Sequence, residues 1–164
     1  MNVSSPAHHT ATIYFSYSQF LVFDSSVSRP GCAWTERHYR QGFARRERNA
    51  SFGTLLEFGH ARVALHLRSY EKSVDDKRVV EVPIEVISGE LVIAGPDELP
   101  SQNSVRVPPG SYRLVVAQAV VDHEHEEIRL FLEKLSAPIP RSRLIVADEQ
   151  LDATLPLLET VEVA

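Results

Sequence analysis

The pattern that decides the fold is clearest in the stretch ARVALHLR, residues 61–68. Apolar residues stand at every second position from Ala61 to Leu67, and they alternate with Arg62, Ala64, His66 and Arg68. Alternation with a period of two is typical of a strand that has one buried face and one solvent-facing face. The stretch therefore predicts a half-buried β-strand.

The same alternation recurs at Val80–Val86, Tyr112–Val116 and Ile128–Leu132. A further stretch, FLVF at residues 20–23, is apolar on both faces, which predicts a central strand. Pro83 cannot donate a ladder hydrogen bond, so we expect its strand to lie at a sheet edge or to carry a bulge. Half-buried strands of this kind are typical of antiparallel sheets.

Turn residues separate these strands, and Ser88-Gly89 predicts a tight hairpin between residues 80–87 and 91–94. Short strands at regular spacing, without long helical patterns between them, predict an all-β fold, an antiparallel β-sandwich. One short helix is expected from Glu36 to Gln41, capped by Thr35 and ended by Gly42. Its Tyr39, together with Phe43, is expected to face the core.

The length of 164 residues predicts a single domain over residues 1–164, with residues 1–10 unstructured. No apolar run reaches the roughly 20 residues that span a bilayer, and residues 1–10 do not resemble a secretory signal. We therefore expect a cytoplasmic protein with no membrane partner. Cys32 is the only cysteine, which excludes an intrachain disulfide.

Charge is segregated along the chain. Residues 1–78 carry eleven Lys and Arg against seven Asp and Glu, whereas residues 79–164 carry six against fifteen. The densest acidic stretch, DHEHEE at residues 122–127, is expected to form an exposed turn between two strands. Its four acidic side chains are the predicted partner-binding residues, and the partner is expected to be a basic protein: Asp122, Glu124, Glu126 and Glu127.

The remaining polar and aromatic residues are expected to have structural roles. His123 and His125 share one face of an extended segment, but two ligands do not make a metal site, so no metal is predicted. The arginines between Arg37 and Arg48 are expected to pair with the acidic second half of the chain and not to bind nucleic acid. We expect Tyr17, Phe20 and Trp34 in the core. No catalytic motif is recognisable, and neither enzymatic activity nor a cofactor is predicted.

Several stretches resemble the competence protein J family in their order and spacing, from about residue 11 to residue 121. They are SYSQFLVFD at residues 16–24, WTE at 34–36, QGFA at 41–44, SF at 51–52, VEVP at 80–83 and PPGSYRL at 108–114.

The resemblance implies a small cytosolic inhibitor that forms a complex with a nuclease, and relatives that resemble immunity proteins of toxin systems. An acidic protein that occupies the basic DNA groove of a nuclease is consistent with the charge pattern. Two other classes stay open. One is a β-sandwich module that binds a small molecule or carbohydrate, with Trp34 and Tyr39 as its first candidate residues. The other is a hydrolase with a dispersed site.

Overall fold

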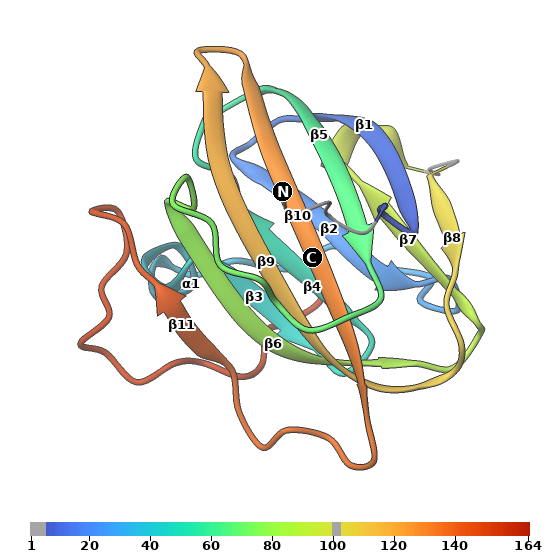
Figure 1. Cartoon of the computed structure of the whole chain (residues 1–164). Coiled ribbons are helices and arrows are strands. Elements are labelled where there is room, and N and C mark those ends of the chain that lie inside the picture. Colours follow the sequence, from blue (N-terminus) through green and yellow to red (C-terminus); the bar gives the residue numbers. More distant parts are fainter. Residues whose placement is uncertain (1–5, 100–102) are drawn as a thin grey trace.

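The computed structural model describes residues 6–99 and 103–164. Residues 1–5 of the N-terminal stretch predicted to be unstructured lie outside this part, and the first strand begins at His9. The elements in chain order are β1 (His9–Phe15), β2 (Gln19–Asp24), α1 (Glu36–Gln41), β3 (Phe43–Arg46), β4 (Asn49–Gly53), β5 (Gly59–His66), β6 (Arg78–Val86), β7 (Glu90–Ala94), the 3-10 turn η1 (Pro96–Glu98), β8 (Ser104–Arg106), β9 (Gly110–Asp122), β10 (His125–Leu135) and β11 (Arg143–Val146) (Figure 1).

The strands form two sheets that face each other. One has the order β1-β5-β10-β9-β6-β11, and the other has the order β3-β4-β2-β7-β8. The pairing is antiparallel throughout except between β5 and β10, which run parallel. The predicted all-β sandwich with one short helix is confirmed. No helix among the described residues is long and apolar enough to cross a membrane.

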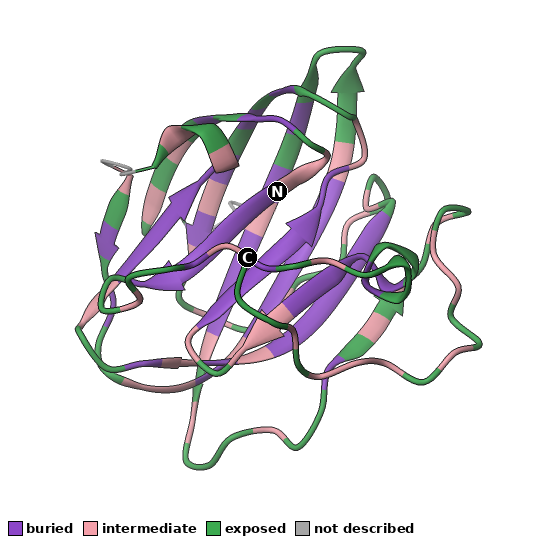
Figure 2. Ribbon diagram, turned by 180° about the vertical axis from the view of Figure 1, so that it is seen from behind, coloured by how far each residue is buried: buried purple, intermediate pink, exposed green. Residues whose placement is uncertain are grey.

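The core lies between the sheets, where the inward positions of nearly every strand are buried (Figure 2). Phe20 of β2 and Phe52 of β4 stack there, with ring centroids 5.4 Å apart. β2 is the middle strand of its sheet, as predicted. Its outward residues Leu21 and Phe23 are also buried, under Val27, which explains why this strand is apolar on both faces.

The Ser88-Gly89 pair does not form a hairpin, so that prediction is wrong. It connects β6 to β7, and these strands belong to different sheets. The connection is held by the buried Asp24 carboxylate, whose Oδ2 accepts hydrogen bonds from the amides of Ile87 at 2.7 Å and Ser88 at 3.0 Å. Burial opposes ionisation of Asp24, but hydrogen bonds from Ser26, Ser88 and Ile87 outweigh it and lower its pKa.

Pro83 lies at a partly open edge. β6 pairs with β9 along its whole length, but β11 covers only Val79 to Glu81 on its other side. Pro83 lies beyond that covered part, where no ladder donor is needed. The prediction placed the whole strand at a sheet edge, but the edge strand is β11, so it holds only for the part of β6 around Pro83 that β11 leaves unpaired.

The helix begins and ends where the sequence predicts. The Thr35 amide donates to His38 Nδ1 at 3.0 Å, and Gly42 takes the left-handed conformation with φ of 82°. Phe43 is fully buried, as expected, but Tyr39 is 56% exposed. The expectation for Tyr39 is wrong because the buried face of α1 is formed by His38 and Gln41, which bind the C-terminal segment.

The C-terminal segment, residues 147–164, crosses the five-stranded sheet on its outer side (Figure 2). Gln41 binds both backbone groups of Leu158: its Nε2 donates to the Leu158 carbonyl at 3.0 Å and its Oε1 accepts from the Leu158 amide at 2.8 Å. Val163 forms an isolated antiparallel bridge with Cys32. Polar contacts therefore fix the segment to the sandwich.

Candidate functional site

The predicted acidic turn is the end of the β9–β10 hairpin. Asp122, Glu124 and Glu127 are exposed there, and we call these three residues the acidic hairpin end. Asp122 Oδ1 accepts hydrogen bonds from the Glu124 amide at 2.9 Å and from His125 Nδ1 at 2.7 Å. These two contacts lower the pKa of Asp122, so its carboxylate is charged at neutral pH.

Glu126 does not belong to that exposed set, which corrects the expectation that all four carboxylates face solvent. Its residue is 1% exposed, because it continues the inward alternation of Ile128 and Leu130. Glu126 Oε2 accepts a hydrogen bond from the Leu56 amide at 2.9 Å. Burial raises the pKa of its carboxyl group, against the lowering effect of Leu56, Leu55, Arg78 and Gln118.

We expect Glu126→Gln to stabilise the protein at pH 7. Glu126 Oε1 and Gln118 Oε1 are both buried acceptors without a partner among the described residues. The side-chain NH2 of a glutamine at position 126 adds a hydrogen-bond donor beside them, which is favoured. The amide keeps an acceptor for Leu56 and removes a buried charge. The gain should be about 1–3 kcal/mol in free energy of unfolding, the usual cost of an unsatisfied buried group.

The stability difference between Gln and Glu at position 126 depends on pH. The pKa of Glu126 is raised in the folded chain, so its contribution to stability is full below the unfolded pKa and is lost as pH rises through the folded pKa. The advantage of Gln over Glu should therefore be largest near pH 7 and small near pH 4 in urea unfolding curves. Glu127→Gln, at an exposed position, is the control and should change little. A destabilised Glu126→Gln protein at pH 7 would contradict the assignment.

The two histidines of the turn do not point to a metal. His125 is half exposed, bonds to Asp122 and stacks on His60 with ring centroids 6.1 Å apart. The His123 side chain is 88% exposed. Within residues 6–99 and 103–164, no three His, Cys, Asp or Glu side chains are grouped to hold a metal ion.

The charge segregation along the sequence is partly cancelled in the fold. Arg78 pairs with Asp148 at 2.9 Å and Arg45 pairs with Glu159 at 3.6 Å, each across the two halves of the chain. Arg113 also binds Glu81 and Glu133 within the second half. The acidic hairpin end has no arginine partner among the described residues, so it keeps its negative charge for solvent or for a partner.

Two side chains of the arginine-rich segment hold the C-terminal segment. Arg45 Nη1 donates to the Glu159 carbonyl at 3.0 Å in addition to its ion pair, and Arg37 donates to the Pro156 carbonyl. The predicted pairing with the acidic half is thus seen at Arg45. Most of the other hydrogen bonds that these arginine side chains donate go to backbone carbonyls.

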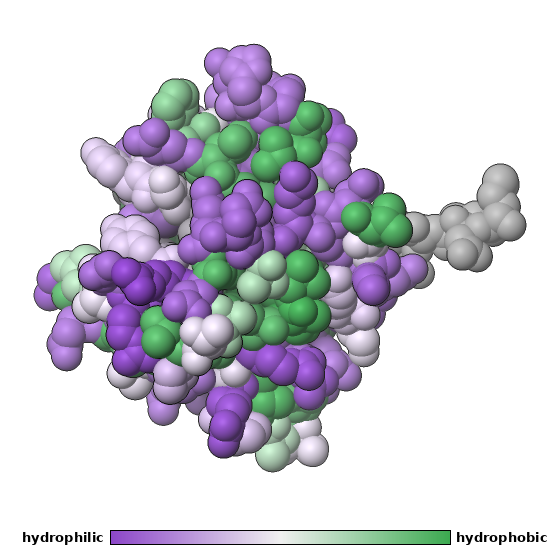
Figure 3. Space-filling view, turned by 90° about the vertical axis from the view of Figure 1, so that its left-hand side faces the viewer, coloured by the Kyte–Doolittle hydropathy of each residue, from purple (hydrophilic) through white to green (hydrophobic). Residues whose placement is uncertain are grey.

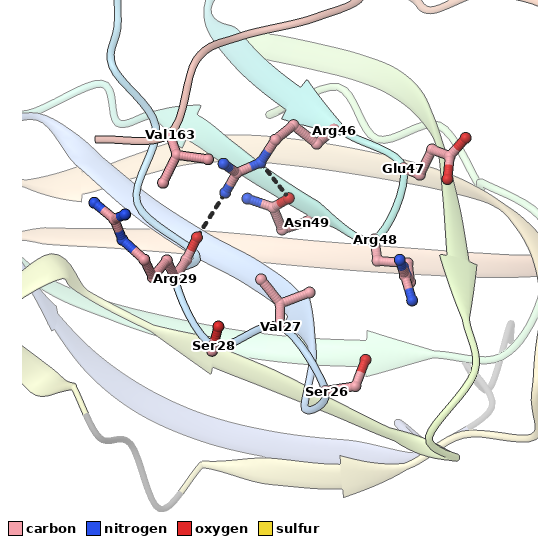
Figure 4. Close-up of a pocket in the computed structure, with 9 residues that line it drawn as sticks. All are labelled: Ser26, Val27, Ser28, Arg29, Arg46, Glu47, Arg48, Asn49 and Val163. Carbon is pink, nitrogen blue, oxygen red and sulfur yellow. Dashed lines mark hydrogen bonds between the residues drawn. The ribbon is translucent and has the colours of Figure 1, made fainter.

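A hollow of about 500 Å³ opens beside this segment, lined by Arg29, Arg46 and Arg48 (Figure 4). Arg46 already donates to Asn49 Oδ1 at 3.0 Å and to the Arg29 carbonyl at 2.7 Å, and Arg29 donates to the Ala164 carbonyl at 2.8 Å. Two of the three guanidinium groups are therefore engaged within the protein. The hollow is not built to concentrate positive charge on one anion.

Two aromatic side chains line a second cavity, of about 350 Å³, and both were the candidate residues of the small-molecule alternative. We call it the aromatic cavity, and its lining includes Trp34, Tyr39, Gly53, Glu57, Arg78 and Gln150. Phe20 is fully buried, as predicted, but the core expectation is wrong for Tyr17, which is 70% exposed, and Trp34 is only half-buried. Two of the quoted family-like stretches, 16–24 and 34–36, contribute Ser18 and Trp34 to this cavity, and their spacing in sequence did not reveal that they meet.

The fold and the site together define an all-β sandwich protein with an acidic hairpin end and an aromatic cavity. The chain belongs to the competence protein J family, whose sequence profile matches residues 12–136. A comparison with curated protein sequences gives no match.

Two solved structures are similar to this chain. The crystal structure of ComJ from Bacillus subtilis, an inhibitor of the DNA-degrading activity of NucA, superimposes with a TM-score of 0.65 at 21% identity, covering 77% of this chain and 96% of that one. The product of crocagin biosynthetic gene J gives a TM-score of 0.49 at 22% identity, covering 75% of this chain and 96% of that one. At 21% identity the likeness to ComJ concerns the fold.

Proposed function

We propose that this protein inhibits a nuclease, in the manner of a competence or immunity protein, and that it acts in the cytoplasm without catalysis or cofactor. Membership of the competence protein J family over residues 12–136 carries the proposal. The fold shared with the NucA inhibitor of Bacillus subtilis supports it. The partner would be a basic protein, and DNA itself would not be bound.

The acidic hairpin end is the contact surface we propose. Three exposed carboxylates at the end of a two-stranded ribbon can enter the DNA groove of a nuclease and occupy positions that DNA phosphates would take. In the side view the tip of the hairpin, at the top, is hydrophilic, and apolar side chains are exposed below it (Figure 3). Protein interfaces commonly have an apolar centre and a polar rim. The apolar side chains below the hairpin suit the centre, and the charged tip suits the rim.

The proposal is tested by capture followed by a nuclease assay. The tagged protein is used to isolate partners from the native host's lysate, and each recovered nuclease is purified separately. Titrating the inhibitor into that nuclease should remove DNA cleavage completely at a fixed molar ratio. Cleavage that persists with excess inhibitor, for every recovered nuclease, would refute the proposal.

One observation favours the alternative of a small-molecule or carbohydrate-binding module: Trp34 and Tyr39 line a cavity with ring centroids 5.0 Å apart. Thermal shift with glycans and metabolites separates the two functions. A ligand that raises the melting temperature equally in low and high salt would favour the module, because charge-driven association weakens with salt.

A further inference from the structure

The indole of Trp34 is held in place in the aromatic cavity by hydrogen bonds and by a ring contact. Trp34 Nε1 donates to Ser51 Oγ at 3.1 Å, and Ser51 Oγ donates to Gln19 Oε1 at 2.8 Å, so the indole is fixed to two strands of the sheet. Tyr39 packs against this indole from α1. A pre-positioned aromatic surface binds without losing much side-chain freedom.

Two loops that close one side of the cavity are tied together. The Ser18 amide donates to the Glu57 carbonyl at 2.8 Å, and the Thr54 amide donates to the Ser18 carbonyl at 2.9 Å. Tyr17 and Ser18 both take left-handed backbone conformations, with φ of 55° and 56°. Consecutive non-glycine residues in this region are strained, and such strain gathers at binding sites where the surrounding structure enforces it.

The charge left in the aromatic cavity is negative. Arg78 lies at its floor but is neutralised by Asp148, which it binds through Nη2 at 2.9 Å and Nε at 3.3 Å. Glu57 is exposed, and its carboxylate has no hydrogen bond or ion pair among the described residues. A free carboxylate beside two aromatic faces is suited to a cation.

The aromatic cavity adjoins the acidic hairpin end. The loop that carries Glu57 reaches β10 through the Leu56 amide, which donates to Glu126, and the His60 amide donates to the Glu124 carbonyl at 2.9 Å. One bound protein can therefore cover both features.

We propose that the aromatic cavity receives an arginine side chain of the inhibited nuclease; this rests on the proposed function. The planar guanidinium stacks on the Trp34–Tyr39 pair and forms an ion pair with Glu57. Arginine fits better than lysine because a guanidinium both stacks on aromatic rings and forms two parallel hydrogen bonds with a carboxylate. Buried aromatic and arginine contacts of this kind commonly contribute most of the affinity of an interface.

The test uses the single tryptophan of the chain as its reporter. N-acetyl-arginine amide is titrated into the protein while the Trp34 indole N–H resonance is followed by NMR. N-acetyl-citrulline amide, the neutral isostere, is the matched probe. We expect a saturable shift with the arginine probe and about five- to tenfold weaker binding of the citrulline probe.

Variants locate the site. Glu57→Gln should reduce the affinity for the arginine probe to that for the citrulline probe, and Tyr39→Ala should weaken both. Both side chains are exposed, so neither change should prevent folding. Glu85→Gln, at the other end of the sandwich, should leave binding unchanged. Equal affinity for the two probes, or a Trp34 shift caused by a neutral sugar instead, would overturn the proposal.

The nuclease assay separates this inference from the proposed function. Tyr39→Ala and Glu57→Gln should each raise the inhibition constant about tenfold. Full inhibition by both variants would overturn the arginine site and leave the proposed function standing. Binding of the arginine probe by a protein that inhibits no recovered nuclease would retain a cation site and overturn its assignment to a nuclease.

Discussion

Changing Asp122, Glu124 and Glu127 together to lysine is expected to weaken nuclease inhibition by at least about a hundredfold. Under the proposed function, each substitution replaces an attraction to the basic groove of the nuclease with a repulsion, and close charge pairs across interfaces contribute about 1.5–7 kcal/mol each in measured cases. The fold should survive, because all three side chains are exposed at the end of the β9–β10 hairpin. The measurement is the inhibition constant, with thermal unfolding measured in parallel.

A matched control variant keeps the net charge equal. Glu47, Glu85 and Glu162 have no side-chain hydrogen bond or ion pair among the described residues, and Glu85 pairs with Ser111 at the end of β9 opposite the hairpin turn. Changing these three to lysine should leave inhibition within about threefold. An equal loss in both variants would assign the effect to net charge, and no loss in the first would remove the acidic hairpin end from the interface.

The second large effect concerns stability. Arg78 is 2% exposed, and besides Asp148 it binds the Gly53 carbonyl at 3.0 Å and Gln150 Oε1 at 2.9 Å. Arg78→Met should lower the free energy of unfolding by about 3–5 kcal/mol, because it leaves the nearly buried Asp148 without its counterion.

The double variant Arg78→Met with Asp148→Leu tests the cause of that loss. It removes both charges, so it should recover much of the stability in urea unfolding. A loss below about 1 kcal/mol for Arg78→Met alone would show that the pair contributes little. A double variant no more stable than the single one would show that packing, and not the unpaired charge, causes the loss.

Local patterns predicted the strands and the helix well, but not how the sheets connect. Alternation identified β5, β6, β9 and β10, and capping residues identified α1, because both depend on neighbours in sequence. The Ser88-Gly89 connection was misassigned because its geometry is set by Asp24, which lies more than sixty residues away. Turn residues cannot distinguish a hairpin from a crossing between sheets.

The candidate site was predicted in part. Exposure of Asp122 and Glu124 follows from their place at the hairpin turn. The exposure of Glu127 and the burial of Glu126 could both have been predicted by extending the alternation of Ile128 and Leu130 backward. The aromatic cavity was not predictable in this way. It requires that segments around Tyr17, Trp34 and Gly53 meet in space, and this depends on the pairing of β2 with β4.

We propose that the acidic hairpin end binds a basic protein partner. The most direct test of this binding is calorimetric affinity for the captured nuclease at increasing salt, which avoids the salt sensitivity of DNA cleavage itself. The screening length falls from about 10 Å at 0.1 M to about 3 Å at 1 M salt, so we expect the dissociation constant to rise at least about tenfold over that range. The lysine variant of Asp122, Glu124 and Glu127 should lose most of this dependence. Tight association that is unchanged at 1 M salt would contradict the claim.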